Sequence, residues 1–181
     1  GSPALAHRVR ELLDPLPVKM DFNWGYDHAA WTVLSVVYPE ADVPVIQLSM
    51  DVSKPISWHY QLGRLLRPLR EEGVLIMGTG NVVHSLSQME WNKAAEPHDW
   101  AHRFNNLVIE CIESDTPDRL FDHQALGYDA AMSIPPADLG HYWPLFYVLG
   151  ARHVNDKLTI NPRHVMYKSL SMLSFILDSG S

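Results

Sequence analysis

The chain has 181 residues, of which 46% are hydrophobic and 19% are charged, a composition that allows a buried core and fits one globular domain. Fourteen Lys and Arg residues stand against 21 Asp and Glu residues, and the net charge of -7 disfavours nucleic acid as a partner because nothing attracts a phosphate backbone. The longest apolar runs, such as residues 74–77 and 145–149, are far shorter than the ~20 residues of a membrane-spanning helix. We therefore expect a cytoplasmic protein.

The first half of the chain predicts alternating helices and strands. Ser2 is a helix N-cap followed by Pro3, and the apolar spacing that follows predicts a helix ending near Pro15. A short helix is expected at residues 29–37, and the β-branched run at 43–49 is typical of a buried strand. Residues 57–72 predict an amphipathic helix with leucines inward and arginines in solvent, stopped by Gly73.

A second strand is predicted at residues 74–81, directly after that amphipathic helix. Strand, long helix and strand in this order form a crossover that pairs the two strands in parallel. Ligands of such sheets gather at the carboxyl ends of the strands. The glycine-rich loop at residues 78–84 is therefore the first place where we expect a site.

The second half of the chain predicts mainly helices. A helix is expected at residues 97–114, a weaker one at 119–131 and a short one at 138–151, while residues 169–177 read as a strand covered on one face. Because no linker or internal repeat divides residues 1–181, we predict a single α/β domain with a mixed, mostly parallel-core sheet flanked by helices.

Two histidines are the main candidates for chemistry. His84 follows the predicted strand after two glycines that let the backbone turn, and it is a candidate metal ligand or general base, although this pattern by itself fits a loop histidine hydrogen-bonded to backbone somewhat better. His141 begins an apolar helix and could face a cleft, although a simple cap fits as well. Neutral imidazole is a good ligand for iron or zinc.

His28 is the third candidate, since Asp27 and several aromatic residues accompany it, although ordinary aromatic packing would explain the same pattern. The other histidines carry less weight. His98 and His102 have zinc-like spacing but no convincing third ligand, and His59 lies in the first turn of the amphipathic helix. Cys111 is expected to be a buried, inert thiol.

Several motifs occur in order along the chain: Gly1-Ser-Pro-Ala-Leu-Ala, Trp24-Gly-Tyr-Asp-His-Ala-Ala-Trp, Asp42-Val-Pro-Val-Ile-Gln-Leu-Ser, Gly73-Val-Leu-Ile-Met-Gly-Thr-Gly-Asn-Val-Val-His, His141-Tyr-Trp-Pro-Leu-Phe-Tyr-Val-Leu-Gly-Ala and Ser169-Leu-Ser-Met-Leu-Ser. Together they resemble the LigB-type (class III) extradiol ring-cleavage dioxygenases, and within them the 4,5-DOPA dioxygenase group. The resemblance implies a non-haem metal, Fe(II) for ring cleavage although Zn(II) can occupy the site, with a catechol and dioxygen as substrates. It implies that His84 serves the metal centre or acid-base work, that His141 binds the metal and that His28 lies near the substrate.

Two departures from the family pattern affect these expectations. Members of the family begin with a His-Gly-Ser-Pro loop and an Ala-His-Trp motif that each supply a metal histidine, and neither occurs here, so the chain is expected to be incomplete at its N-terminus. Two histidines anchor a metal poorly, and we expect weak metal binding, low activity and a tendency to form homo-oligomers. Gly140 also stands where relatives have an acidic residue before the histidine.

Two other functions are compatible with the same residues. A metal-dependent hydrolase would use these histidines to activate water. A non-catalytic binding protein would have lost the metal centre altogether.

Overall fold

The computed structural model describes residues 1–180, with the side chains of residues 137 and 138 left aside. The helices are α1 (Pro3–Leu12), α2 (His28–Val37), α3 (Ile56–Leu66), α4 (Pro68–Glu71), α5 (Asp99–Glu113), α6 (Tyr128–Ser133) and α7 (Pro144–Gly150), with 3-10 turns η1 (Leu86–Gln88), η2 (Pro117–Leu120) and η3 (Pro136–His141). The strands are β1 (Lys157–Ile160), β2 (Val165–Met166), β3 (Leu170–Ser171) and β4 (Phe175–Asp178).

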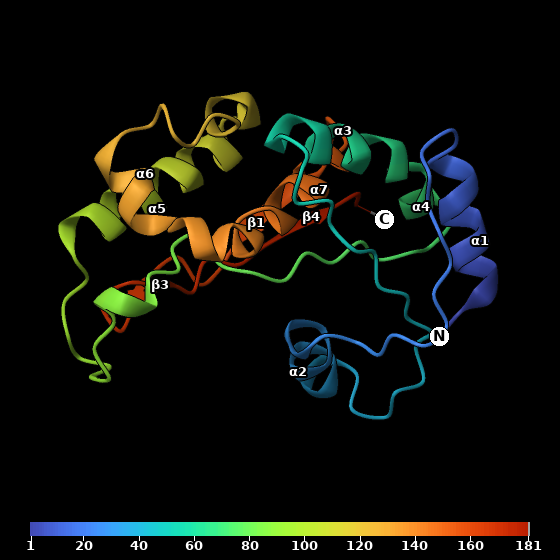
Figure 1. Cartoon of the computed structure of the whole chain (residues 1–181), viewed down its shortest axis with the longest axis horizontal. Helices are drawn as coiled ribbons and strands as arrows, with labels where there is room; N and C mark the ends of the chain where they lie inside the picture. The colour runs from blue at the N-terminus through green and yellow to red at the C-terminus, as the bar shows by residue number, and fades with distance from the viewer. Residues whose placement is uncertain (181) are drawn as a thin grey trace.

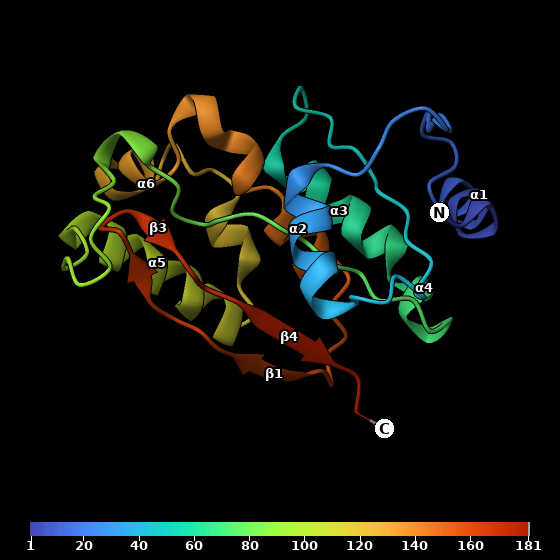
Figure 2. The same ribbon diagram turned by 90° about the horizontal axis from the view of Figure 1, so that it is seen from below.

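The helices form a row, with α5 and α6 at one end of the molecule, α1 and α4 at the other and α3 and α7 between them (Figure 1). The two strands β1 and β4 run along one edge of this row (Figure 2). Helix α2 lies apart from the row in Figure 1, and none of its residues is buried. None of the helices in residues 1–180 is long and apolar enough to cross a membrane.

Proline residues divide two of the predicted helices. The helix expected at residues 57–72 is split into α3 and α4 at Pro68, and the one expected at 138–151 into η3 and α7 at Pro144. Proline has no N–H to continue the helical hydrogen bonds, so it fits the first turn of a new helix better than the interior of one. The predicted N-cap is confirmed, because the Ser2 hydroxyl accepts a hydrogen bond from the Leu5 N–H at 3.3 Å.

The predicted parallel-core sheet is not confirmed. The sheets of residues 1–180 are two antiparallel pairs, β1 with β4 in the register Lys157↔Asp178 to Ile160↔Phe175, and β2 with β3. Residues 43–49 and 74–81, expected as parallel strands, are extended but belong to neither sheet. An extended segment becomes a strand only when a neighbour supplies its hydrogen-bond partners, and apolar patterning alone does not provide that neighbour.

Two other predictions need correction, one in the C-terminal strand and one in the amphipathic helix. The strand expected at 169–177 is interrupted at residues 172–174, so that β3 and β4 belong to different sheets. Within the predicted inner stripe of leucines, Leu62, Leu66 and Leu69 are buried, but Leu65 is 46% exposed. Leu66 and Leu69 follow Leu62 by four and seven positions and share its face of the helix, whereas Leu65 lies at the edge of that face.

The core has two parts. One surrounds α5, α6 and α7 and includes Phe104, Val108, Tyr142 and Phe146, and the other joins α1, α3 and the start of α4. Alternate residues of the two extended segments pack on this second part: Ile46, Leu48, Met50, Val74 and Ile76. Extended chains present every second side chain to one face, which is why this spacing recurs.

Candidate metal and substrate site

His84 is held where three parts of the chain meet. Its N–H donates to the Ser133 carbonyl at the end of α6 at 2.8 Å, and it forms an isolated antiparallel bridge with Leu170 of β3. On either side, Val83 and Ser85 are buried, and the Ser85 N–H donates to the Ser169 carbonyl. The backbone on both sides of His84 is therefore fixed, while its own side chain is half-buried.

His141 is the last residue of η3, and its position depends on a close approach by the glycine-rich segment. The Asn81 N–H donates to the His141 carbonyl at 2.9 Å. A side chain at Gly80 would collide with this same carbonyl, and one at Gly78 would come within 2.7 Å of the Pro144 carbonyl. The two glycines found in the sequence are thus needed because the backbones of residues 78–81 and 141–144 nearly touch.

The two imidazoles lie against one another. The ring centroids of His84 and His141 are 3.8 Å apart, and the ring planes are inclined by only 11°. Both residues are half-buried, and the Nδ1 atom of His84 is shielded from solvent. The structure therefore places side by side the two residues that the sequence marks as metal ligands.

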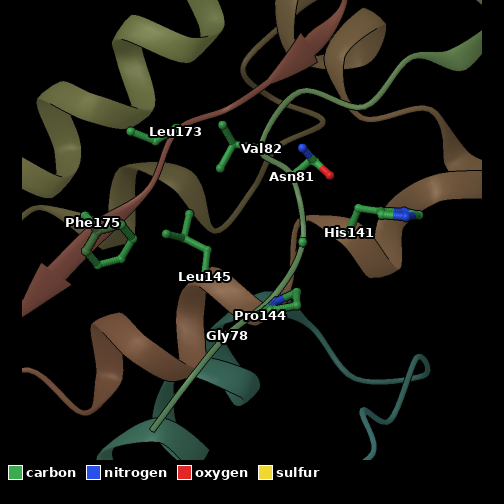
Figure 3. Close-up of a pocket in the computed structure, with 9 residues that line it drawn as sticks. Gly78, Asn81, Val82, His141, Pro144, Leu145, Leu173 and Phe175 are labelled. Atoms are coloured by element: carbon green, nitrogen blue, oxygen red, sulfur yellow. The ribbon is translucent and has the colours of Figure 1, made fainter. Parts of the chain in front are cut away.

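His141 also lines a small pocket beside the glycine-rich segment. Figure 3 shows the apolar side chains of Val82, Leu145, Leu173 and Phe175 on one side of that segment, and Asn81 and His141 on the other. The Asn81 amide is fixed in place, since its N–H donates to the Ser171 carbonyl at 2.6 Å. The site thus has an apolar side and a polar side, divided by the backbone of residues 78–81.

The donor set fits a metal ion only in part. Neutral imidazole suits iron and zinc, and the two adjacent rings supply two such donors. No group of three or more His, Cys, Asp and Glu residues able to hold a metal ion occurs among the residues that the structure describes. The pair therefore accounts for part of a coordination shell.

His28 occupies a different setting, at the exposed start of α2. The carboxylate of its neighbour Asp27 accepts hydrogen bonds from the Gln47 side-chain amide at 2.6 Å and from the Trp24 indole N–H at 3.3 Å. Helix α2 is thus tied to the extended segment 43–49, and the expected role of His28 beside a substrate stays a prediction.

A known protein family matches nearly the whole chain. The family described as the catalytic LigB subunit of aromatic ring-opening dioxygenase matches residues 1–174. The chain belongs to this family. The resemblance found in the sequence motifs is therefore confirmed.

Named proteins and a solved structure are similar to the chain over most of its length. It is 43% identical to a protein named 4,5-DOPA dioxygenase extradiol from Escherichia coli K12, over 96% of this chain and 65% of that protein. A protein of the same name from Mirabilis jalapa is 34% identical over 87% of this chain and 58% of the relative. The crystal structure of an uncharacterized Escherichia coli K12 protein superposes with a TM-score of 0.86 at 43% identity, over 97% of this chain and 72% of that one.

The chain spans somewhat under two thirds of the length of these two LigB relatives, 65% and 58%. The single catalytic domain expected over residues 1–181 stays a prediction.

One histidine of this LigB chain, His59, is more deeply buried than its place in the first turn of a helix indicates. It is completely buried in α3, with its Nδ1 2.8 Å from the Tyr147 hydroxyl and its ring stacked on Trp143. The signal was present in its spacing, because His59 precedes Leu62 by three positions and Leu66 by seven and so lies on the buried stripe of the helix.

The remaining expectations about side chains are simpler. Cys111 is buried in α5, and burial raises the pKa of its thiol, which agrees with an inert residue. His98 stacks on Trp100 with its Nε2 3.1 Å from the Gln88 carbonyl, while His102 lies beside Asn106. These contacts give both histidines ordinary structural roles.

Proposed function

We propose that the chain carries the catalytic site of an extradiol dioxygenase, which opens the ring of a DOPA-like catechol beside its hydroxyl groups with dioxygen. The observation that supports this most directly is the His84–His141 pair, whose ring centroids lie 3.8 Å apart in a chain of the LigB family. The names of the relatives from Escherichia coli and Mirabilis jalapa point to the same substrate class.

His84 and His141 are the residues that would hold the metal, Fe(II) for activity, although Zn(II) could take its place. Redox chemistry between a catechol and dioxygen is what a bound iron would supply, because no side chain provides it. The Ser133 and Leu170 contacts fix His84, and the Asn81 N–H fixes the backbone of His141. Because the described residues form no group of three or more metal-binding side chains, we expect this chain by itself to bind a metal weakly.

Proton transfer is assigned to His28, and to His84 if that residue serves acid-base work instead of binding the metal. Imidazole changes its charge near neutral pH, so it can accept a proton from a catechol hydroxyl and return it later. Trp24 and Tyr26 accompany His28 and are exposed, and flat apolar side chains of this kind can lie against an aromatic ring.

The proposal also includes the domain, the sheet, the cellular location and the partners expected for this chain. Residues 1–181 would form one catalytic domain, and the extended segments 43–49 and 74–81 would be strands of its parallel sheet. Their alternate apolar residues on a shared helical layer support that arrangement. We also keep the cytoplasmic location, the absence of nucleic-acid and membrane partners and the tendency to form homo-oligomers as part of it.

The first prediction concerns turnover. With excess ferrous iron, which offsets the expected weak metal binding, and a panel of catechols, we expect slow oxygen consumption and a yellow ring-opened semialdehyde, measured by an oxygen electrode and by visible absorbance. His84→Ala and His141→Ala should each lower the rate by roughly 100-fold or more, beyond what loss of an outer-shell partner costs. A chelator should abolish the activity, and ferrous iron should restore it.

His102→Ala is the matched control, because it removes a histidine that contacts Asn106 on the surface of α5. The Escherichia coli relative serves as the reference enzyme. Absence of product across the panel while the reference is active would contradict the proposal. Zinc-dependent ester hydrolysis without oxygen consumption would instead support a metal-dependent hydrolase.

A further inference from the structure

His59 is buried more completely than either histidine of the candidate site. Its side chain has no exposed surface, although histidine is only intermediate in its tendency to be buried. Three aromatic residues surround it: Trp143 is stacked at 4.8 Å between ring centroids, Trp58 meets it edge-on at 5.1 Å, and Tyr147 lies at 5.5 Å. His59 does not line the pocket beside His141, so a direct role in binding is not indicated.

The hydrogen bonding of His59 fixes both its charge and its orientation. Burial lowers the pKa of His59 and raises the pKa of Tyr147 to about 12, so both groups are neutral at physiological pH. The protonated Tyr147 hydroxyl can then donate to Nδ1 at 2.8 Å, which leaves the imidazole hydrogen on Nε2. Nε2 is buried and has no partner of good geometry among the described residues.

Both of the main partners of His59 belong to the segment that carries His141. Trp143 follows His141 by two residues, and Tyr147 lies one helical turn further along, in α7. Helices α3 and α7 approach so closely that a side chain at Gly63 would collide with the Tyr147 carbonyl. Any change at His59 would therefore be passed to residues 141–147 instead of being absorbed by a gap.

We propose that His59 is a positioning residue for His141. Its ring lies against Trp143 and its Nδ1 bonds the Tyr147 hydroxyl, so that the start of α7 is fixed in the rotation that brings the His141 imidazole onto His84. This inference rests on the proposed function only in taking the His84–His141 pair as the functional site. It assigns to His59 neither a ligand nor a step of the reaction.

The experiment uses three variants that keep an aromatic ring at both positions. His59→Phe keeps an aromatic ring but removes the acceptor, Tyr147→Phe removes the donor, and the double variant removes both. Two measurements are made on the whole chain: the nitrogen and proton NMR signals of the His84 and His141 rings, and the affinity for Zn(II) by calorimetry. Val108→Ala, which creates a cavity beside the buried side of α5, is the control for a general loss of stability.

We expect each single variant to shift the His141 ring signals and to weaken zinc binding by about tenfold, as substitutions behind metal ligands do. The double variant should be no weaker than either single one, because both remove the same bond. Val108→Ala should unfold more easily yet keep the zinc affinity and the ring signals of the wild-type chain.

Unchanged zinc affinity and unchanged His141 signals in His59→Phe would overturn the proposal and leave His59 a packing residue. Additive effects of the two single variants would also overturn it. If the wild-type chain binds no more zinc than His84→Ala, the metal centre of the proposed function fails. The NMR signals would still decide whether His59 positions His141.

Discussion

At the scale of single residues, Arg70 behaves differently from the arginine that helical patterning predicts. It was expected in solvent, but its guanidinium donates to both carboxylate oxygens of Asp156 at 2.6 and 2.8 Å, and to the carbonyls of Ala151 and Leu177. The Asp156 side chain has no exposed surface. One arginine thus joins α4, the end of α7 and β4.

The second prediction follows from this ion pair. Burial alone would raise the pKa of Asp156, but hydrogen bonds from Arg70 and from the His153 N–H outweigh it and hold that pKa below its usual value. Asp156→Asn should lower the free energy of unfolding by about 3 kcal/mol, because it leaves a charge with little access to water. Urea denaturation followed by circular dichroism measures the change.

The control for Asp156→Asn is Asp129→Asn. Asp129 also accepts two hydrogen bonds from one arginine, Arg103, both at 2.7 Å, but the arginine side chain is 58% exposed. Water compensates for a lost partner at an exposed position, so a much smaller loss of stability is expected. Equal losses in the two variants would show that burial of Asp156 does not matter.

At the scale of secondary-structure elements, glycines set the distances that form the site. Gly63 and Gly150 allow α3 and α7 to touch, and Gly78 and Gly80 allow the extended segment 74–81 to touch the start of α7. The amphipathic pattern predicted most of these helices, but it says nothing of how near they approach. Helix α7 makes close glycine contacts on two sides, and His141 lies three residues before its first residue, Pro144.

The third prediction compares two glycines near His141. Gly80→Ala should destabilise the chain by roughly 1–3 kcal/mol, as overpacking does, because the added carbon meets the rigid His141 carbonyl. Gly140→Ala places the same carbon beside His141 where no atom lies within 4 Å, and should leave stability nearly unchanged. Thermal denaturation of both variants tests the pair, and an undisturbed Gly80→Ala would show that the segments can separate freely.

At the scale of the whole molecule, folding stability should depend on pH through the buried His59 and the half-buried His123. Burial lowers the pKa of His59 and of His123 in the folded chain, whereas both return to about 6.5 when it unfolds. As the pH falls below that value, the unfolded chain takes up protons that the folded chain refuses. Stability is therefore fully present above the unfolded pKa and is lost as the pH falls toward the folded pKa values.

The fourth prediction is thus a declining free energy of unfolding from pH 7 toward pH 5, measured by urea denaturation at fixed ionic strength. Replacing His59 with Phe and His123 with Gln together should flatten this part of the curve, whatever they do to its height. A curve of the same slope in the double variant would assign the acid sensitivity to other groups.

The sequence by itself determined the family, the identities of the paired histidines and most helix positions, because these depend on local spacing: the Ser2 cap, the apolar stripe of α5 and the ordered motifs around His84 and His141. It did not determine the pairing of extended segments, the burial of Arg70 and His59 or the distance between the two imidazoles. Those depend on which distant backbones meet. A strand needs a partner at hydrogen-bonding distance, and a polar side chain is buried only where a second element, such as α7 over α3, excludes water from it.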